Sequence, residues 1–500
     1  MRGMPALPAA IFTAQQVRDL DRRAIDELGI PGYELMTRAG HATLNALRAL
    51  WPATRSLSVL CGPGNNGGDG YVVARVARAQ GLRTTVVALA DPDTLRGDAR
   101  RAYDDFVAAG GRCERWSPHA LEADVVVDAI FGTGLAREVV GLQCDVMRAM
   151  NAARRPVVAV DIPSGLHADT GVVLGIATRA DVTVTFIGRK LGLYVGDGPE
   201  LTGRIVFDDL GVPRETYHGM PLTAHVLDEA IVAAALPRRP RAAHKGMHGH
   251  VLVIGGGPGM PGAARLAGEA ALRAGAGLVT VATHPANLGA LAGRPELMCV
   301  GVETAADLAP ALRRATVLAL GPGLGQTDWS RELHAAALAA GKPLVVDADA
   351  LNLLSNLPVR RDDWVLTPHA GEAARLLGIS NAAVQRDRLA AAAALQRRYG
   401  GTAVLKGAGT IVQAAGQPPA ICDRGNPGMA VAGMGDVLTG VIAGIAAQCS
   451  EPGGDLSRAA AAGVFVHAQA GDLAARKGER GMLAGDALEQ VRVCVNPSPG

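Results

Sequence analysis

The sequence predicts two α/β domains, the first of them a doubly wound parallel sheet with helices on both faces. Three observations lead to this prediction. The chain has 500 residues, which is too long for one hydrophobic core. Short apolar runs that end in glycine or an acid alternate with helical stretches, as buried parallel strands and their crossover helices do. This alternation stops near residues 210–249, which include a basic stretch rich in proline and glycine, and then restarts.

The domain boundary is therefore expected around residues 220–224, with domains at 11–219 and 224–496. In the first domain, helices such as 67–81 separate the predicted strands, which lie at 56–62, 84–90, 123–132, 156–165 and 180–188. In the second domain, the corresponding apolar runs lie at 250–257, 276–284, 315–323, 342–352, 363–372 and 402–409. Ligands of doubly wound sheets bind at the carboxyl ends of the strands.

The composition excludes several classes of protein. The 49 basic and 47 acidic residues give a net charge of +2, which excludes a strongly basic nucleic-acid binder, and 3% aromatic residues leave few platforms for base stacking. The seven cysteines form no CxxC pair and have no partner at zinc spacing, which is typical of a reducing compartment. The stretch 1–13 contains two prolines and makes a poor signal peptide. We expect a cytoplasmic protein.

The stretch 428–448 is long and apolar enough for a membrane helix, but Asp436 lies near its centre and five glycines weaken it. A loop over 426–435 followed by a helix from Asp436 is the better prediction. The amides of Gly433 and Gly435 would then be free at the helix start, beside the Asp436 carboxylate. Exposed amides next to an acid form an anion site with a base, which suits phosphoryl transfer to a hydroxyl. A plain aspartate cap on a buried helix is the structural alternative.

The glycine-rich segment 61–70 follows a predicted strand and opens a helix, so its backbone can approach an anionic ligand. It contains neither a GxGxxG fingerprint nor a Walker lysine, and a tight turn is the alternative. Because parallel strands of one sheet end at the same edge, four polar residues are expected to converge there, namely Asn66, Asp128, Asp161 and Ser164. Their oxygens suit a hard cation and not zinc, although acids at strand ends also serve as helix caps.

Three motifs in the first domain, GPGNNGGDG, DAIFGTGL and VDIPSGL, resemble the epimerase half of the bifunctional NAD(P)H-hydrate repair enzymes. The resemblance covers nearly all of residues 11–215, including the motif 186–205 that contains Lys190. It implies a Rossmann-like fold, a potassium ion held by Asn66, Asp128 and Ser164, and proton transfer by Asp161. It also implies that the hydrated nicotinamide dinucleotide contacts Asn65, Asn66, Gly67, Gly68, Asp69, Gly132, Thr133, Gly134, Leu135, Ala136, Arg137, Glu138 and Asp161.

Residues 245–495 resemble the ribokinase-like fold and, within it, the ADP-dependent NAD(P)H-hydrate dehydratases. The motifs GPGLG, DADALN, TPHAGE, KGAGTIV and GNPGMAVAGMGDVLTGVIAG match in order. The resemblance implies ADP as co-substrate, with magnesium, and Asp436 as the base. It implies dinucleotide contacts at Ala263, Gly323, His369 and Asp436, and nucleotide contacts at Lys406, Gly407, Ala408, Gly409, Thr410 and Gly435. The chain departs from the family at Met260, where an aromatic residue is common, and at Ala432, where glycine is common.

Together the two resemblances imply metabolite repair. The first domain would interconvert (R)- and (S)-NAD(P)HX, and the second would dehydrate the S epimer to NAD(P)H while ADP is converted to AMP and phosphate. One alternative is a small-molecule kinase, for a vitamin or sugar, fused to a ligand-binding Rossmann-like domain, although vitamin kinases of this fold usually carry asparagine in place of His369. A scaffold in RNA-decay assemblies is the second alternative. The expected partners are NAD(P)HX, ADP and further copies of the chain, without nucleic acid or membrane.

Overall fold

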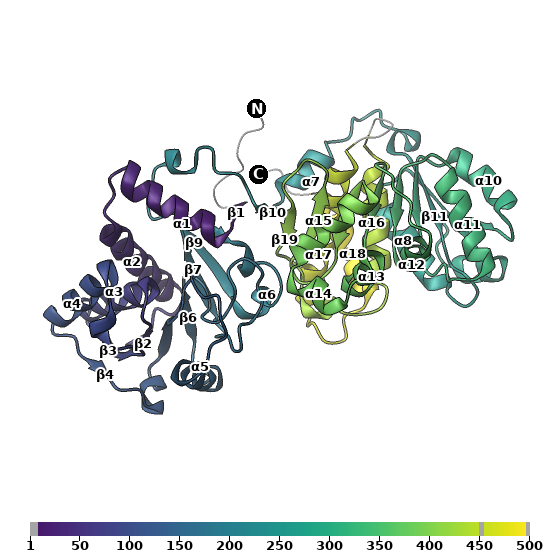
Figure 1. Cartoon of the computed structure of the whole chain (residues 1–500). Coiled ribbons are helices and arrows are strands. Elements are labelled where there is room, and N and C mark those ends of the chain that lie inside the picture. The colour runs from purple at the N-terminus through teal and green to yellow at the C-terminus, as the bar shows by residue number, and fades with distance from the viewer. Residues whose placement is uncertain (1–8, 450–454, 497–500) are drawn as a thin grey trace. The chain divides into compact units, whose positions relative to one another are not determined.

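The computed structural model describes residues 9–449 and 455–496. The chain forms two compact units that divide between His225 and Val226. Each unit consists of a sheet with helices packed against it, which confirms the predicted α/β class. Figure 1 shows the first unit in purple to teal and the second in teal, green and yellow.

The sheet of the first unit has seven parallel strands within the described residues, in the order β4-β3-β2-β5-β6-β7-β9. Strand β2 pairs with β3 on one side and with β5 on the other, so the chain reverses direction across the sheet at β2, as in doubly wound folds. The strands are β2 (Ser56–Cys61), β3 (Arg83–Ala88), β4 (Cys113–Glu114), β5 (Val125–Ala129), β6 (Val157–Val160), β7 (Val182–Phe186) and β9 (Arg204–Asp208). The short strand β1 (Ala10–Phe12) pairs with β8 (Arg189–Lys190) in parallel and with β10 (Ala224–Val226) in antiparallel orientation.

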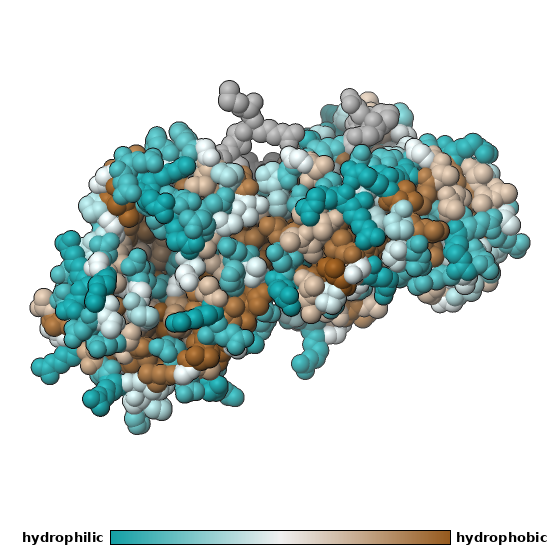
Figure 2. Space-filling model, in the orientation of Figure 1, coloured by the Kyte–Doolittle hydropathy of each residue, from teal (hydrophilic) through white to brown (hydrophobic). Residues whose placement is uncertain are grey.

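Helices cover both faces of this sheet. Because neighbouring residues of a strand point to opposite faces, they enter two different cores. Val59 packs into the core formed with α1, α2, α3 and α4, whereas Leu60 packs into a second core with Met147 of α5. Helix α1 is amphipathic, and its polar outer face forms part of the hydrophilic surface of this unit in Figure 2. The helices are α1 (Ala14–Arg22), α2 (Gly32–Leu50), α3 (Asn65–Ala79), α4 (Gly97–Ala108), α5 (Leu142–Ala152) and α6 (Gly198–Leu201).

The described sheet of the second unit runs in the order β13-β12-β11-β14-β15-β16-β17-β18-β19. It is parallel from β13 to β17, and the hairpins that follow add β18 and β19 in antiparallel orientation. The strands are β11 (His250–Ile254), β12 (Leu278–Thr283), β13 (Met298–Gly301), β14 (Val317–Leu320), β15 (Leu344–Val346), β16 (Trp364–Leu366), β17 (Thr402–Leu405), β18 (Thr410–Ala414) and β19 (Ala420–Cys422), and β10 (Ala224–Val226) lies at the unit boundary.

Two predicted strands of this unit are too long. The run 342–352 is strand only to Val346, and the run 363–372 only to Leu366. The remaining residues begin helices, because Asp347 and His369 take extended N-cap conformations that end each strand. The helices are α7 (Ala230–Ala235), α8 (Pro261–Arg273), α9 (Leu288–Leu291), α10 (Ala305–Arg314), α11 (Asp328–Ala339), α12 (Ala348–Asn356), α13 (Ala370–Leu377), α14 (Asn381–Arg386), α15 (Arg388–Tyr399), α16 (Met434–Ala446), α17 (Leu456–Ala475) and α18 (Ala484–Cys494).

Helix α16 is the apolar stretch that raised the membrane question, and it is a core helix. A Cβ atom at Gly440 would lie 2.1 Å from the carbonyl oxygen of Ala267, so the glycine lets α16 pack directly on the backbone of α8. No helix among the described residues has the length and apolar character needed to cross a membrane. The helix begins at Met434, two residues before the predicted start, because Gly433 caps it in a left-handed conformation with a φ of +91°.

Candidate active sites

The first unit contains a cavity of about 710 Å³ at the carboxyl ends of its strands. Its walls come from the segments that follow β2 and β5, from the residue that ends β6, and from α1 and α2. The structure thus brings most of the predicted dinucleotide contacts together around one space. The predicted residues that line it are Asn65, Asn66, Asp69, Gly132, Thr133, Gly134, Leu135, Ala136, Arg137 and Asp161.

Asp161 is held in this cavity by an unusual backbone and a buried cation. Its φ is +69°, a left-handed conformation that aspartate tolerates better than most residues and that is often found at functional sites. Its Oδ1 accepts a hydrogen bond from the Phe186 amide at 3.2 Å and is ion-paired with Lys190 Nζ. Lys190 is 1% exposed and also donates to Thr185 Oγ1 and to the Phe186 carbonyl. Lys190, whose role the sequence left open, positions the Asp161 carboxylate.

Two further acids that line the same cavity have a raised pKa. Burial raises the pKa of Asp21 to about 6, with a smaller opposing effect from the charge of Lys190. Burial also raises the pKa of Asp69 well above its usual range, and the charges of Asp161 and Asp21 add to this effect. The sequence indicated Asp69 within its glycine loop, but Asp21 lies in the last turn of α1 and carries no recognisable local signal. Four carboxyl groups, those of Asp21, Asp69, Asp98 and Asp161, therefore line the cavity together with the Lys190 ammonium group.

Two of the predicted cation ligands, Asp128 and Ser164, are hydrogen-bonded to each other. The Ser164 hydroxyl donates to Asp128 Oδ1 at 2.6 Å, and the Ser164 amide donates to Asp128 Oδ2 at 2.9 Å. Asp128 is 0% exposed, and burial raises its pKa. Its hydrogen bonds from Ser164 oppose this shift only in part. The side-chain amide of Asn66 is buried close to Gly132, with a nitrogen that has no hydrogen-bond partner. An amide flip would place an oxygen at that position, so the residues present fit a monovalent hard cation.

Three predicted contact residues do not line the cavity. Gly67 and Gly68 lie in the first turn of α3, where a Cβ would come within 2.1 Å of the Gly62 carbonyl oxygen and 2.7 Å of Met36 Cε, respectively. These glycines let the loop and the helices pack closely, which shapes the cavity from behind. Glu138 is exposed and lies outside the lining residues.

In the second unit, a buried ion pair joins the ends of two strands. Lys406 Nζ lies 2.7 Å from Asp347 Oδ1, and Thr439 Oγ1 of α16 donates to Asp347 Oδ2 at 2.9 Å. Although burial opposes ionisation of Asp347, the neighbouring charge of Lys406 and these hydrogen bonds hold its pKa below the usual value. Asp347 belongs to the DADALN motif but was not among the predicted site residues. Its contact with Lys406 joins residues 59 positions apart.

Asp436 lies in the first turn of α16, next to this ion pair. Burial raises the pKa of Asp436 to about 6, the charge of Asp347 adds to the shift, and Lys406 opposes it. A Cβ at Gly435 would lie 3.2 Å from Asp347 Oδ2 and 3.3 Å from Lys406 Nζ, so this glycine leaves room above the pair. Asp436 itself is only partly buried. The site thus offers a carboxyl group whose pKa is near neutrality beside a fixed ammonium group, a combination suited to general base chemistry.

His369 and Glu372 approach the same ammonium group from the start of α13. His369 Nδ1 accepts a hydrogen bond from the Gly371 amide at 3.0 Å, and Glu372 Oε2 accepts one from the His369 amide at 2.8 Å. Burial lowers the pKa of His369, and burial raises the pKa of Glu372 to about 7. Glu372 Oε2 lies 3.9 Å from Lys406 Nζ. His369 remains well exposed and available to a ligand, whereas Glu372 faces inward.

Glycine turns form the rest of this site. A Cβ at Gly323 would lie 3.1 Å from Ala263 Cβ and 3.0 Å from Met260 Cβ. The predicted dinucleotide contacts Ala263 and Gly323 are therefore neighbours, and Met260 lies beside them. The predicted nucleotide segment is the turn between β17 and β18, where Thr410 Oγ1 donates to the Gly407 carbonyl. Arg388, which no sequence motif indicated, is 3% exposed and donates to the carbonyls of Leu405 and Lys406 just before this turn.

Acid–base groups at the strand ends of two separate α/β units define a two-domain enzyme with two sites. The family model described as "YjeF-related protein N-terminus" matches residues 32–192, and the model described as "NAD(P)H-hydrate dehydratase" matches residues 251–492. The Coxiella burnetii protein named bifunctional NAD(P)H-hydrate repair enzyme Nnr is 47% identical over 490 residues, covering 97% of this chain and 99% of that protein. The Escherichia coli protein of the same name is 44% identical over 498 residues, covering 98% and 95%. The chain belongs to the family of bifunctional NAD(P)H-hydrate repair enzymes.

A solved structure agrees with the fold of the second unit. A ribokinase-like superfamily protein from Enterococcus faecalis is 32% identical, with a TM-score of 0.51, over 55% of this chain and 96% of that chain. The second unit therefore has the ribokinase-like fold, as the sequence motifs predicted.

Proposed function

We propose that the chain repairs hydrated nicotinamide cofactors in two steps, one in each unit. The first unit interconverts the R and S epimers of NAD(P)HX. The second unit dehydrates the S epimer to NAD(P)H and converts ADP to AMP and phosphate. The observation that carries this proposal is the match to bifunctional repair enzymes over nearly the full length of the chain, with acid–base groups present in both units.

In the first unit, Asp161 transfers the proton that epimerisation requires. The buried Lys190 ammonium balances the carboxylate and holds it against the cavity, while the loops 65–69 and 132–138 hold the dinucleotide. Potassium is the proposed occupant of the Asn66, Asp128 and Ser164 cluster, where a fixed positive charge would offset the buried Asp128 carboxylate. The proton transfer itself is assigned to Asp161, with Lys190 positioning the carboxylate.

In the second unit, Asp436 takes the proton from the ring hydroxyl of the S epimer, and this hydroxyl then accepts the terminal phosphoryl group of ADP. The amides of Gly433 and Gly435 face the charge that develops, and Lys406 adds a fixed positive charge beside it. Loss of phosphate from the ring carbon, together with loss of a proton from the adjacent ring carbon to solvent, restores the double bond of NAD(P)H. We assign the adenine nucleotide to the turn over residues 406–410.

Magnesium would reach this site with the nucleotide. No group of three or more histidine, cysteine or acidic side chains among the described residues is placed to hold a metal ion by itself. Magnesium commonly binds through one or two carboxylates together with substrate phosphates. The inward-facing Glu372, and Asp349, whose charge acts on Asp436, are the carboxylates that we propose for such a site when nucleotide is bound.

A small-molecule kinase of the same fold is the competing assignment. His369 in the position of the usual asparagine, and the presence of the first unit, argue against it. A kinase would release a stable phosphorylated product, whereas the dehydratase releases phosphate. We further propose a homo-oligomer in the cytoplasm, and the seven free cysteines support a reducing compartment.

A direct assay tests the proposal. Purified protein is incubated with mixed epimers of NADHX and with ADP or ATP, with and without potassium, and the recovery of NADH absorbance is followed. We expect complete recovery of both epimers with ADP, and conversion of only the S epimer when the first unit is inactivated. Mass spectrometry of the same mixtures would overturn the proposal if a stable phosphorylated product accumulated and no NADH returned.

A further inference from the structure

The second unit contains a larger cavity, of about 1030 Å³, at the end of the unit opposite the proposed active site. Its lining includes Arg273 in the last turn of α8 and Gln448 just beyond the end of α16. The active-site residues Ala263 and Asp436 lie in the first turns of the same two helices. At a rise of about 1.5 Å per residue, the two ends of α16 are roughly 18 Å apart. The cavity is therefore separate from the site of the proposed chemistry.

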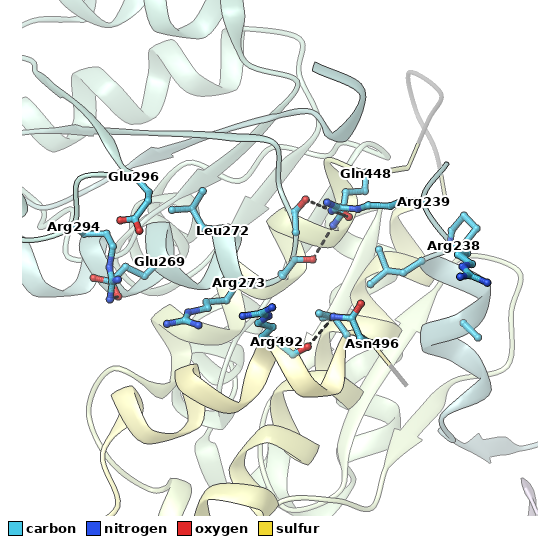
Figure 3. Close-up of a pocket in the computed structure, with 16 residues that line it drawn as sticks. Arg238, Arg239, Glu269, Leu272, Arg273, Arg294, Glu296, Gln448, Arg492 and Asn496 are labelled. Carbon is cyan, nitrogen blue, oxygen red and sulfur yellow. Dashed lines mark hydrogen bonds and ion pairs between the residues drawn. The ribbon is translucent and has the colours of Figure 1, made fainter. Parts of the chain in front are cut away.

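Unpaired arginines surround this cavity. Five arginines and two glutamates, Glu269 and Glu296, line it, and among the described residues Arg294 is the one arginine of the five with an ion pair, to Glu269 at 3.0 Å. Within the residues that the structure describes, Arg238, Arg273 and Arg492 have neither an ion pair nor a side-chain hydrogen bond. Figure 3 shows Arg273 and Arg492 in the middle of the cavity, between the Arg294 group and the Arg238 and Arg239 group. A chain with a net charge of only +2 thus concentrates cationic groups at one place.

Arg239 is fixed in place by neutral partners. It donates to the Gly275 carbonyl at 2.5 Å and to Gln448 Oε1 at 2.6 Å, and Gln448 in turn donates to the carbonyls of Ala274 and Gly444. These bonds orient the guanidinium group and leave its charge unbalanced. A pre-oriented guanidinium group is the side chain best suited to bind phosphate oxygens in a forked arrangement.

Favourable interactions with helix ends do not account for this arrangement. Arg273 and Arg492 each lie in the last turn of a helix, where a cation gains about 0.3–1 kcal/mol from the helix dipole. That gain acts on each helix separately. It does not explain why cations from two helix ends and from the linker residue Arg238 line one cavity, where they repel one another.

Apolar side chains complete the wall. Leu236, Leu272 and Val495 line the cavity beside the arginines. A pocket with several cationic groups and an apolar wall fits a ligand that carries phosphates and an apolar or aromatic body. The volume is large enough for a nucleotide. We propose that this cavity is a second, non-catalytic binding site for a nucleoside polyphosphate, distinct from the nucleotide turn of the active site.

Equilibrium dialysis of the full-length protein with ATP tests the site. We expect two ATP molecules bound per chain. The double variant Arg273→Ala/Arg492→Ala should retain one, with affinity at the other site weakened about tenfold or more for each lost charged hydrogen bond. The matched control is Arg313→Ala, because Arg313 also lies exposed in the last turn of a helix, α10, but outside the cavity. It should bind like the unmodified protein.

The single variant Arg492→Glu guards against misfolding, because Arg492 is exposed and its replacement disturbs no core. It should weaken the second site further and leave dehydration of (S)-NADHX with saturating ADP unchanged. Inorganic tripolyphosphate should compete with ATP at this site, and the competition should weaken as salt rises. The proposal is overturned if the variants bind two ATP molecules as before. It is also overturned if Arg492→Glu changes only the oligomeric state in sedimentation, since the arginines would then form a subunit contact.

Discussion

Asp161 and Asp436 have opposite electrostatic surroundings. Asp161 has a left-handed backbone and is ion-paired with a buried lysine, whereas the Asp436 carboxyl group has no ion pair within the described part of the chain and is affected by the charges of Asp347 and Lys406. A paired carboxylate is held in one position. An unpaired carboxyl group with a raised pKa can take a proton near neutral pH.

The pH dependence of dehydration should report Asp436. Burial raises the pKa of Asp436 to about 6, and only its ionised form can accept a proton, so kcat/KM should rise with pH through about 6 and level off above it. Glu372, with a pKa of about 7, is the competing source of such a limb. The profile of Glu372→Gln therefore serves as the control, and it should keep the limb near 6. If the limb disappeared in Glu372→Gln, the titrating group would be Glu372 and not Asp436.

Replacement of Asp436 should also stabilise the ligand-free protein. The folded state binds this proton more tightly than the unfolded state, so the cost of ionisation is absent below pH about 4, grows as pH rises to about 6, and stays constant above. Asp436→Asn removes this cost, and its free energy of unfolding at pH 8 should exceed that of the unmodified protein by about 1–3 kcal/mol. Urea denaturation at pH 8 and pH 4 measures the difference. Lower stability of the variant at pH 8 would contradict it.

Breaking the ion pair between Lys190 and Asp161 should lower the free energy of unfolding, the opposite of the effect expected for Asp436→Asn. Lys190→Met leaves the Asp161 carboxylate without its buried partner and should cost about 2–3 kcal/mol of unfolding free energy. The double variant Lys190→Met/Asp161→Asn should recover much of that loss, because the unpaired charge is gone. Denaturation of the unmodified protein, both single variants and the double variant gives the coupling energy. Strictly additive losses would mean that the pair has no energetic coupling.

At the scale of elements, glycines determine how closely α16 packs. Gly440 touches the backbone of α8, and Gly444 lies close to Ala271 of the same helix. This close packing places the first turn of α16, with Asp436, at the strand ends beside Lys406. The apolar character of the helix, which resembles a membrane span in sequence, is explained by burial between α8 and α17.

A pair of helical glycines tests this packing. Gly440→Ala would place a methyl group 2.1 Å from the Ala267 carbonyl oxygen, so the helices must move apart at a cost of about 1–3 kcal/mol. Gly485→Ala in α18 meets nothing within 4 Å and should stabilise the protein by about 0.5–1 kcal/mol. Thermal denaturation compares the two. Equal midpoints would show that α16 tolerates a methyl group at this contact.

At the scale of the whole chain, each unit has its own hydrophobic core and its own proposed catalytic acid. The product of the first reaction is the substrate of the second, so a free intermediate can pass between different molecules. Such a division of labour predicts complementation between inactive chains.

Asp161→Asn should dehydrate the S epimer and leave the R epimer to slow spontaneous epimerisation, whereas Asp436→Asn should epimerise and return no NADH. A mixture of the two variants should repair both epimers at a rate set by the slower reaction. Recovery of NADH absorbance from the mixture and from each variant alone provides the measurement. If either variant alone lost both activities while its circular dichroism stayed unchanged, the assignment of one step to each unit would fail.

Local patterns in the chain were enough to predict the alternation of strands and helices, the glycine loops after β2 and before α16, and the family. Those features are encoded in contiguous residues, because strand burial and turn geometry depend on neighbours in sequence. The left-handed backbone of Asp161, the placement of Asp21 and Lys190 beside it, the pairing of Asp347 with Lys406 and the arginine cavity became visible only in the folded chain. They depend on burial and on charges brought together from distant segments, and no local pattern encodes such contacts.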